Sequence, residues 1–588
     1  MKKDKNNLMS RYVKLQSLVV LFGITCVFFS CTKDILDKTP LDAISEADVY
    51  GDVNLLSAFV ASTYNNVRHI HQGGDRVGTE ALGDLTYFSR GDQAGVGVYQ
   101  DARVEASTGE DVTLDLWLKS YRGIRTVNLF LEGIENSPLT QEELDPLAAQ
   151  MRFIRAYLYL DLLQWYGGIP IIEKSFSLED ESFDVARNSV EEVVAFISAE
   201  ADAMLPSLPE VAPGSRASKA GAMALKAKAM LIAASPLFNP SNDMSKWQAA
   251  SSANEAVMNL STYQMSDDYA SIFNDGNLEA EIIFAREYNE DLHQGGWSGA
   301  NVLLWSIGFG GWSNVQPNNK YISFFERQTD GVRPLLYDEN TQAISINPAA
   351  AGFDPKDPYL DLDPRFGAQF NYNQSNYKER TMEYWVEYAT DGTGAPDGRD
   401  IVARGTDDDG NGDATQTGYN IIKLTDPSVG RLQDNFNASS FSPDIKFRKT
   451  EFYLNYAECQ LALGNEENAR NAINAVRARA SVNMPAIPGT VSGTDLVEAY
   501  RRERAIEMFM EDQRFFDIRR WKIAEDVMGK PIFGTHIEKL SDGTFMYDYT
   551  RVPNNTGARA WNDKLYFLPI PLDEITRSNG TLTQNPGY

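Results

Sequence analysis

Residues 450–480, TEFYLNYAECQLALGNEENARNAINAVRARA, predict two antiparallel helices joined by a tight turn. Apolar residues recur with a helical period on both sides of Gly464-Asn465, and glycine commonly ends a helix. The small residues Ala457 and Ala469 leave room for the two helices to nest against each other. A single pair of this kind cannot bury a core alone, so the sequence predicts stacked helical neighbours.

The spacing of Ala457, Gly464, Ala469 and Ile473 is similar to the small and apolar positions of a tetratricopeptide repeat. The alanine-rich stretch 217–260 could supply a neighbouring pair with a longer loop inserted. An unrelated antiparallel helix pair is the alternative that these spacings leave open.

Further helical patterns place a mainly α-helical scaffold on both sides of an irregular region. The expected helices begin near residue 53 and continue at 117–134, 148–166, 189–205, 217–234, 247–260, 450–463, 466–480, 495–511 and 515–528. We expect one domain over residues 46–588, with its scaffold at 46–285 and 446–530. Residues 286–445 are rich in Gly, Asn, Asp and aromatics and predict an irregular, loop-rich insert, because so long an irregular stretch usually carries function. Residues 531–588 are expected to form an ordered tail.

The amino terminus has the layout of a bacterial lipoprotein signal. Five cations precede twelve mostly apolar residues at 18–29, a run too short to span a bilayer, and Ser30-Cys31 follows. We expect residues 1–30 to be removed, Cys31 to carry the acyl chains, and residues 31–45 to form a tether. An ordinary cleaved signal with a chance cysteine is the alternative.

Composition restricts the classes of partner and cofactor. The formal net charge is −28, which argues against nucleic acid, because nucleic-acid affinity comes largely from Lys and Arg on phosphates. Four histidines make a histidine-rich metal site improbable, and we expect no required cofactor. Only Cys31 and Cys459 would remain after processing, so an acylated Cys31 leaves no intramolecular disulfide.

Motifs along nearly the whole chain resemble one family. They are DILDKTP at 34–40, RAYLYLD at 155–161, WYGGIP at 165–170, SKAGAMAL at 218–225, DPRF at 363–366, TGYNIIK at 417–423, ERAIE at 503–507, RFFDIRRW at 514–521, PIP at 569–571 and QNPGY at 584–588. In this order, behind a lipoprotein signal, they resemble the SusD/RagB family of Bacteroidetes outer-membrane lipoproteins.

The resemblance implies a right-handed superhelix of tetratricopeptide-like helix pairs with a large irregular ligand-binding region. It also implies a non-enzymatic role: capturing oligosaccharides at the cell surface and delivering them to a TonB-dependent, SusC-like transporter. The protein would then be lipid-anchored in the outer membrane and face the cell exterior, and the acidic Asp34 close behind Cys31 resembles the family's surface-export signal.

Two segments fit a sugar-binding role, because aromatic faces match the C–H patches of sugar rings and polar neighbours match the hydroxyls. The first holds Trp297, Trp305 and Trp312 among glycines and amides, with Tyr288 and Asn314 beside them. The second segment comprises Tyr87, Phe88, Arg90 and Asp92. Burial of each tryptophan under its own loop is the competing interpretation.

Asp407, Asp409, Asn411 and Asp413 stand at positions 1, 3, 5 and 7 of a calcium-loop pattern. Position twelve is Gly418 rather than glutamate, so another segment would have to supply the bidentate ligand. The sequence therefore allows a structural calcium site, and a solvated acidic turn is the alternative.

The block at 501–511 is rich in Arg and Glu at spacings of three and four, so we expect structural ion pairs along one helix rather than catalysis. Arg519, Arg520 and Trp521 are expected to pack that helix on the next. Two other functions stay open: the same receptor role for a peptide or another nutrient, and a surface glycoside hydrolase, which needs two carboxylates across the scissile bond.

Overall fold

The computed structural model describes most of the expected domain. The described residues are 46–68, 78–89, 95–176, 185–212, 215–273, 280–288, 304, 309, 311–387, 398, 400–401, 414–425, 441–551 and 559–588. The predicted signal, Cys31 and the tether lie outside them. No helix in the described ranges is long and apolar enough to cross a membrane.

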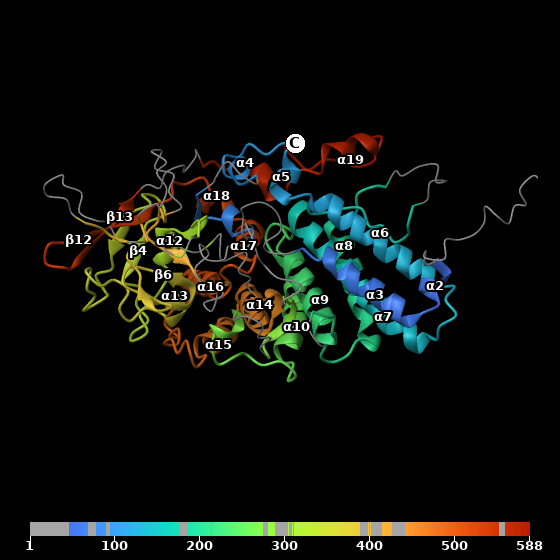
Figure 1. The fold of residues 1–588 in the computed structure, drawn as a ribbon, viewed down its shortest axis with the longest axis horizontal. Helices are drawn as coiled ribbons and strands as arrows, with labels where there is room; N and C mark the ends of the chain where they lie inside the picture. The colour runs from blue at the N-terminus through green and yellow to red at the C-terminus, as the bar shows by residue number, and fades with distance from the viewer. Residues whose placement is uncertain are drawn as a thin grey trace, which may run out of the picture.

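Consecutive helices pack side by side and form the scaffold. They are α3 (Val53–Thr63), α6 (Leu116–Ile134), α7 (Gln141–Tyr166), α8 (Val190–Met204), α9 (Lys219–Ala234), α10 (Met244–Met258), α14 (Lys449–Ala462), α15 (Glu466–Arg477) and α16 (Thr494–Glu507). From α6 to α10 each helix contacts the next, α10 then contacts α14, and α14 contacts α15. In Figure 1 the series runs from α6 on the right to α15 near the centre. The mainly helical prediction is confirmed, with paired helix contacts.

The helix pair predicted from residues 450–480 is present as α14 and α15. Gly464 makes the turn with φ +79°, a conformation that glycine adopts without strain. Ala457, Ala469 and Ile473 are buried in one shared cluster. The small residues thus lie where the helices meet.

Some predicted helix boundaries were wrong. α7 begins seven residues before the expected start at residue 148, because Thr140 and Glu143 form a reciprocal cap there. The helix expected over 495–511 ends at Glu507, and Met510 and Asp512 adopt positive φ. The next expected helix divides into α17 (Arg514–Arg520) and α18 (Ala524–Val527), with a positive φ at Lys522 between them.

The predicted insert forms a lobe of short strands at the end of the molecule opposite α6 and α7 (Figure 1). Its elements are β3 (Val315–Pro317), α12 (Asn319–Ile322), β4 (Leu335–Tyr337), β5 (Ile344–Ile346), α13 (Pro364–Gln369), β6 (Phe370–Asn371), β7 (Asn376–Tyr377), β8 (Arg380–Thr381), β9 (Val386–Glu387) and β10 (Asn420–Ile421). We call this region the loop lobe. Antiparallel two-stranded pairs join β4 to β5, β7 to β8, and β10 to β6.

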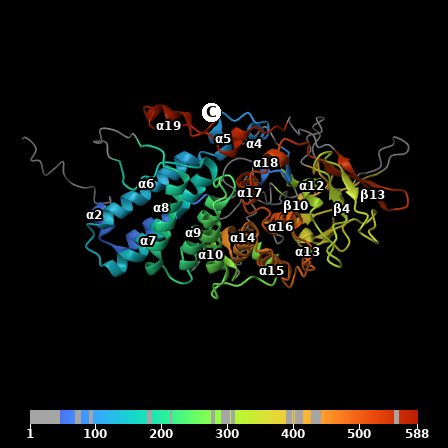
Figure 2. The same cartoon turned by 180° about the vertical axis from the view of Figure 1, so that it is seen from behind.

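Strands from outside the insert complete these small sheets. β1 (Thr86–Phe88) pairs with β3, and β11 (Asp444–Arg448) pairs with β2 (Ile282–Arg286). The carboxy-terminal region supplies the hairpin of β12 (Gly534–Lys539) and β13 (Phe545–Arg551), and β12 also pairs in parallel with β9. The view from behind in Figure 2 shows this hairpin at the outer edge of the loop lobe.

The chain end returns to the helices. Asn585 donates to the carbonyl oxygens of Tyr166, at 3.0 Å, and Leu568, at 2.6 Å. The remaining short elements are α2 (Glu46–Tyr50), η2 (Tyr64–Asn66), η3 (Glu80–Leu82), α4 (Val96–Gln100), α5 (Gly109–Thr113), η4 (Leu205–Ser207), η5 (Ser271–Phe273), η8 (Asp563–Tyr566) and α19 (Leu572–Arg577).

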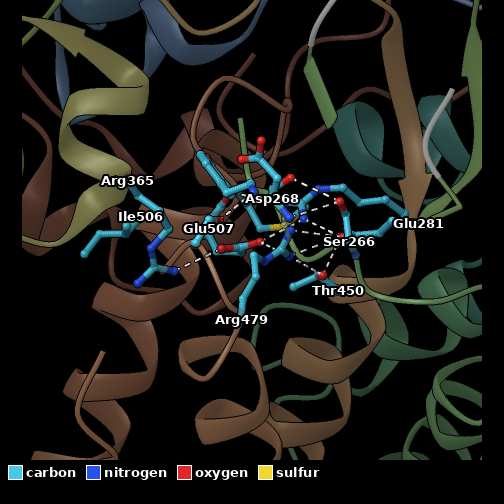
Figure 3. A network of polar contacts seen from close by, with 12 residues as sticks. Ser266, Asp268, Glu281, Arg365, Thr450, Arg479, Ile506 and Glu507 are labelled. Carbon is cyan, nitrogen blue, oxygen red and sulfur yellow. Dashed lines mark hydrogen bonds and ion pairs between the residues drawn. The ribbon is translucent and has the colours of Figure 1, made fainter. Parts of the chain in front are cut away.

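A buried network of ion pairs centres on Glu507, at the end of α16. Its carboxylate contacts Arg365 of α13, Arg448 of β11 and Arg479, which follows α15, each at 2.9 Å. Figure 3 shows Glu507 between Arg365 on one side and Arg479, Thr450 and Glu281 on the other. Burial opposes ionisation, but the three guanidiniums together hold the pKa of Glu507 well below its ordinary value.

Two neighbouring carboxylates extend the network. Glu503 contacts Arg365 at 2.5 Å and Arg477 at 2.8 Å, and Glu511 contacts Arg448 at 2.6 Å and Lys423 at 2.7 Å. The block is structural, and Arg501 pairs along the helix with Glu498 as expected, but for Glu503, Glu507 and Glu511 the expected pairing along one helix was wrong. These glutamates reach other elements, because they face the core rather than the solvent.

The expected packing of residues 519–521 on the preceding helix is confirmed for Trp521, whose ring is centred 6.1 Å from the Tyr500 ring of α16. Arg520 contacts Glu458 of α14 at 2.6 Å, and the Trp521 indole donates to the same carboxylate at 2.8 Å. Arg519 instead donates to the backbone carbonyl oxygen of Tyr566 at 2.5 Å.

We expect Glu507→Gln to lower the free energy of unfolding by about 3–5 kcal/mol, because it leaves buried guanidiniums short of a negative partner. Denaturant unfolding measures this change. Glu498→Gln is the matched control on α16, since the Glu498 side chain is 47% exposed and pairs with Arg501 near the surface, where such pairs contribute about 0–1 kcal/mol. Equal losses in the two variants would contradict the assignment.

Glu80 makes stability depend on pH. It is fully buried, its two carboxylate oxygens have no hydrogen-bond partner, and burial raises its pKa to about 8. The folded state therefore holds a proton that the unfolded chain releases near pH 4.5. The contribution of protonated Glu80 to the free energy of unfolding is complete below pH 4.5, and it is lost as the pH rises to about 8.

We therefore expect Glu80→Gln to raise the melting temperature relative to the unsubstituted protein, increasingly between pH 5 and pH 8. Each unit of pKa shift corresponds to about 1.4 kcal/mol, so the free energies of unfolding of the variant and the unsubstituted protein should differ by several kcal/mol near pH 8. Thermal unfolding across this range tests it, with Glu105→Gln as an exposed control. Parallel pH profiles for the Glu80 variant and the unsubstituted protein would contradict the prediction.

Candidate functional site

The β1–β3 pairing brings together the two segments that the sequence predicted as ligand-binding. Tyr87 stands opposite Gln316 and Phe88 opposite Val315 in an antiparallel register. The Ser89 backbone N–H also donates to the Asn314 carbonyl oxygen at 2.8 Å. Residues 86–89 and 311–317 are therefore parts of one region of the loop lobe.

Three of the predicted contact residues are buried in this region. Tyr87 and Phe88 are each 2% exposed, and Asn314 is fully covered. A sugar ring could reach these side chains only if the segments above them moved. Their predicted contact with a ligand stays untested.

Trp312 is in a different position, because it is only partly buried and packs against two hydrophobic clusters. We call the second of these the lobe aromatic cluster. Its members are Phe309, Trp312, Tyr377, Met382, Tyr384, Trp385, Ile422, Ile537, Phe545 and Tyr547. A ring held on one side and partly open on the other can stack on a ligand with little loss of side-chain freedom.

Cations lie against the same cluster. The Arg380 guanidinium lies 4.2 Å and the Lys378 ammonium 5.1 Å from the centre of the Phe309 ring. The Lys539 ammonium lies 4.3 Å from the centre of the Trp385 ring. Arg380 also pairs with Asp400 at 2.5 Å, so its position is fixed. The cluster thus combines aromatic faces with hydrogen-bond donors.

Tyr288 lies just beyond the end of β2, which pairs with β11, whereas Trp312 precedes β3, which pairs with β1. It is partly buried, with the Arg286 guanidinium 5.7 Å from the centre of its ring. Burial raises its pKa, so the phenol is protonated at neutral pH and can donate a hydrogen bond.

The other predicted site residues lie outside the described residues. They are Trp297, Trp305, Arg90 and Asp92 for the ligand, and Asp407, Asp409, Asn411 and Asp413 for calcium. Within the described ranges no group of three or more His, Cys, Asp or Glu residues is arranged to hold a metal ion. The calcium prediction therefore stays a prediction.

Sequence reasoning missed a row of tyrosines on the β12–β13 hairpin. Tyr547 and Tyr549 alternate with polar residues along β13 and are partly buried. The Tyr547 ring is centred 5.4 Å from Tyr359, which in turn lies 4.5 Å from Tyr372. The period-two pattern FMYDY at 545–549 was the available signal, because alternation in a strand places every second residue on one face.

Family models match both parts of the chain. The model described as "SusD family" matches residues 280–588, which is more than half of the chain. A second model, "Starch-binding associating with outer membrane", matches residues 37–231. Among curated proteins, SusD-like protein P25 of Formosa agariphila is 24% identical over 96% of this chain and 97% of its own length. SusD-like protein P2 of the same organism is 23% identical over 86% of this chain and 88% of its own.

Solved structures agree with the family models. A SusD-like protein of Bacteroides fragilis superposes with a TM-score of 0.73 at 27% identity, covering 94% of this chain and all of that chain. A SusD-like carbohydrate-binding protein of the same species gives 0.71 at 24% identity, covering 90% and 98% of the two chains. The order of helices, the loop lobe and the family match agree along the chain, and this protein belongs to the SusD family.

Proposed function

We propose that this protein is a cell-surface glycan-binding lipoprotein that captures oligosaccharides and delivers them to a TonB-dependent, SusC-like outer-membrane transporter. Membership of the SusD family, whose proteins bind ligands without catalysis, is the observation that carries the proposal. The starch-binding description of the second matching family model supports a carbohydrate ligand. A further SusD-like protein with this fold, at 19% identity and a TM-score of 0.57, is described as laminarin-binding.

The loop lobe is the proposed place of ligand contact. Trp312 offers a partly buried ring in the lobe aromatic cluster, whose Phe309 ring lies against Lys378 and Arg380. Trp297 and Trp305 belong to the same glycine-rich segment of the sequence. Stacking contacts contribute about 1 kcal/mol each, and association costs offset part of the total. The expected affinities are micromolar to millimolar, which suits a receptor that must release its cargo.

The proposed location is the outer surface of the outer membrane. Acylated Cys31 would hold the protein there, and residues 32–45 would join the anchor to α2. Fully extended, this tether spans at most about 50 Å. The domain would therefore lie within that distance of its anchor.

Two finer features of the family resemblance are part of the proposal. The helix pairs from α6 to α16 are inferred to form a right-handed tetratricopeptide-like superhelix. Calcium is proposed to bind the segment Asp407, Asp409, Asn411 and Asp413, where it would organise the neighbouring loop.

Affinity electrophoresis of a soluble form, residues 33–588, against a panel of polysaccharides tests the function. We expect one glycan class to retard the protein without release of reducing ends, and the retardation to weaken with chelator if calcium organises the loop. An absence of retardation across the panel would contradict the glycan-binding function and favour a peptide or another nutrient. Release of reducing ends would contradict the non-catalytic role.

Substitution of single tryptophans locates the site. We expect Trp312→Ala or Trp297→Ala to weaken glycan binding about fivefold, because each removes roughly 1 kcal/mol of stacking. Isothermal titration measures the affinity, and an unchanged circular dichroism spectrum shows that folding is intact.

Trp561→Ala is the matched control, because Trp561 is also partly buried but packs on Tyr566 in the carboxy-terminal region, with ring centres 5.0 Å apart. It should bind glycan like the unsubstituted protein. Unchanged affinity in both Trp297 and Trp312 variants would rule out this part of the loop lobe.

A further inference from the structure

A small polar pocket lies where the carboxy-terminal region meets the loop lobe, and Trp312 is not among its lining residues. Its volume is about 10 Å³, and its polar lining includes Asp84, Asn318, Lys320, Tyr337, Lys530 and Arg559. These residues come from four separate segments: the turn before β1, the start of α12 with β4, the chain after α18, and residue 559. The pocket is therefore a junction between distant parts of the chain.

Arg559 is the unusual member of this pocket. It is 8% exposed, and its Nη2 donates to the Gly83 carbonyl oxygen at 3.1 Å. Its Nε is buried without a hydrogen-bond partner. No carboxylate of the described residues forms an ion pair with it, and burial lowers its pKa to about 10. A buried guanidinium without a negative partner is costly, so this arrangement calls for an anion.

The nearby carboxylates are already committed to other cations. Asp84 contacts Arg514 at 2.8 Å and Lys320 at 3.1 Å. Glu339 contacts Lys320 at 2.8 Å and Lys530 at 3.4 Å. Asp101 acts on Arg559 electrostatically but pairs with Arg103 at 2.8 Å.

The charges around the pocket do not balance. Four cations, Arg514, Lys320, Lys530 and Arg559, face three carboxylates: Asp84, Glu339 and the exposed Asp338, which acts on Lys530 electrostatically. Glu80 also faces Arg514, but burial keeps it protonated at neutral pH. The cluster therefore carries an excess of about one positive charge inside a protein whose formal net charge is −28.

We propose that this pocket binds one small monovalent anion of halide size, with chloride as the physiological occupant. A cavity of about 10–15 Å³ holds one water-sized particle, which fits a halide ion but not a sulfate or a whole carboxylate. The ion would lie against Arg559 and between the cationic ends of Lys320 and Lys530. It would join the carboxy-terminal region to the segment before β1, independently of the glycan site.

Crystals grown with bromide in place of chloride test the site directly, because bromide scatters anomalously. We expect one anomalous peak within contact distance of the Arg559 guanidinium. Crystals that show anomalous bromide only elsewhere on the protein, or none, would overturn the proposal.

A solution measurement gives a second, independent test. A ligand that binds only the folded state stabilises it in a saturable way. We expect chloride to raise the melting temperature by a few degrees over gluconate at the same ionic strength, since gluconate is too large for the pocket. Equal melting temperatures in the two salts would overturn the proposal.

Variants test whether the bromide peak and the chloride effect come from the same site. Arg559→Gln should abolish both the bromide peak and the chloride effect. If that variant does not fold, Lys530→Gln, at the rim, should still reduce the chloride effect. Lys356→Gln is the control, because Lys356 is an exposed lysine on the same lobe that lies near Asp542 rather than the pocket. A chloride effect that Lys530→Gln leaves intact would place the ion elsewhere and overturn the proposal.

Discussion

The carboxylate of Glu507 is the constraint on which the rest of the structure depends. Three guanidiniums from three different elements converge on it in a fully buried place, and each needs its negative partner to be tolerated there. The pairs form only when α13, β11 and the end of α15 reach the end of α16 together. A misplaced element would leave a charge buried and unpaired, so we infer that the network selects one relative arrangement of these segments.

The same network attaches the loop lobe to the helices. Arg365 and Lys423 belong to the lobe, whereas Glu503, Glu507 and Glu511 lie on or just after α16. Burial and the nearby Arg448 lower the pKa of Lys423 to about 8, although Glu511 favours its charged form. The proposed binding loops thus extend from a base fixed by charge pairs, which leaves their outer residues free to differ without loss of the fold.

Periodicity was enough to predict the helices but not what they contact. Ala457, Gly464 and Ala469 are close in sequence, so their pattern shows one helix pair directly. Arg365 and Glu507 are separated by 142 residues, and no local pattern links them. The helical period of the glutamates therefore identified a structural block but predicted their partners on the same helix, whereas the partners of Glu507 lie on α13, on β11 and after α15.

The same lack of long-range information in the sequence explains why the burial of two candidate site residues was not predicted. Tyr87 and Phe88 resemble loop aromatics in sequence, and only their pairing with Gln316 and Val315, more than two hundred residues later, buries them. Trp312 was within reach of sequence reasoning because glycines surround it, which marks a loop whatever its partners. Tyr547 was missed because its tail hairpin joins the loop lobe through partners far away in sequence, among them β9, Tyr359 and Asn373.

Arg448 and Arg559 show two ways to keep a guanidinium inside this protein. Arg448 meets three carboxylates, from Glu281, Glu507 and Glu511, and these raise its pKa well above the ordinary value against the effect of burial. Arg559 has a backbone carbonyl and no ion pair among the described residues, and its pKa falls. The first arrangement is complete within the chain. The second is balanced only if a negative charge enters from solution, and a pocket that holds one water-sized particle limits that charge to a small ion.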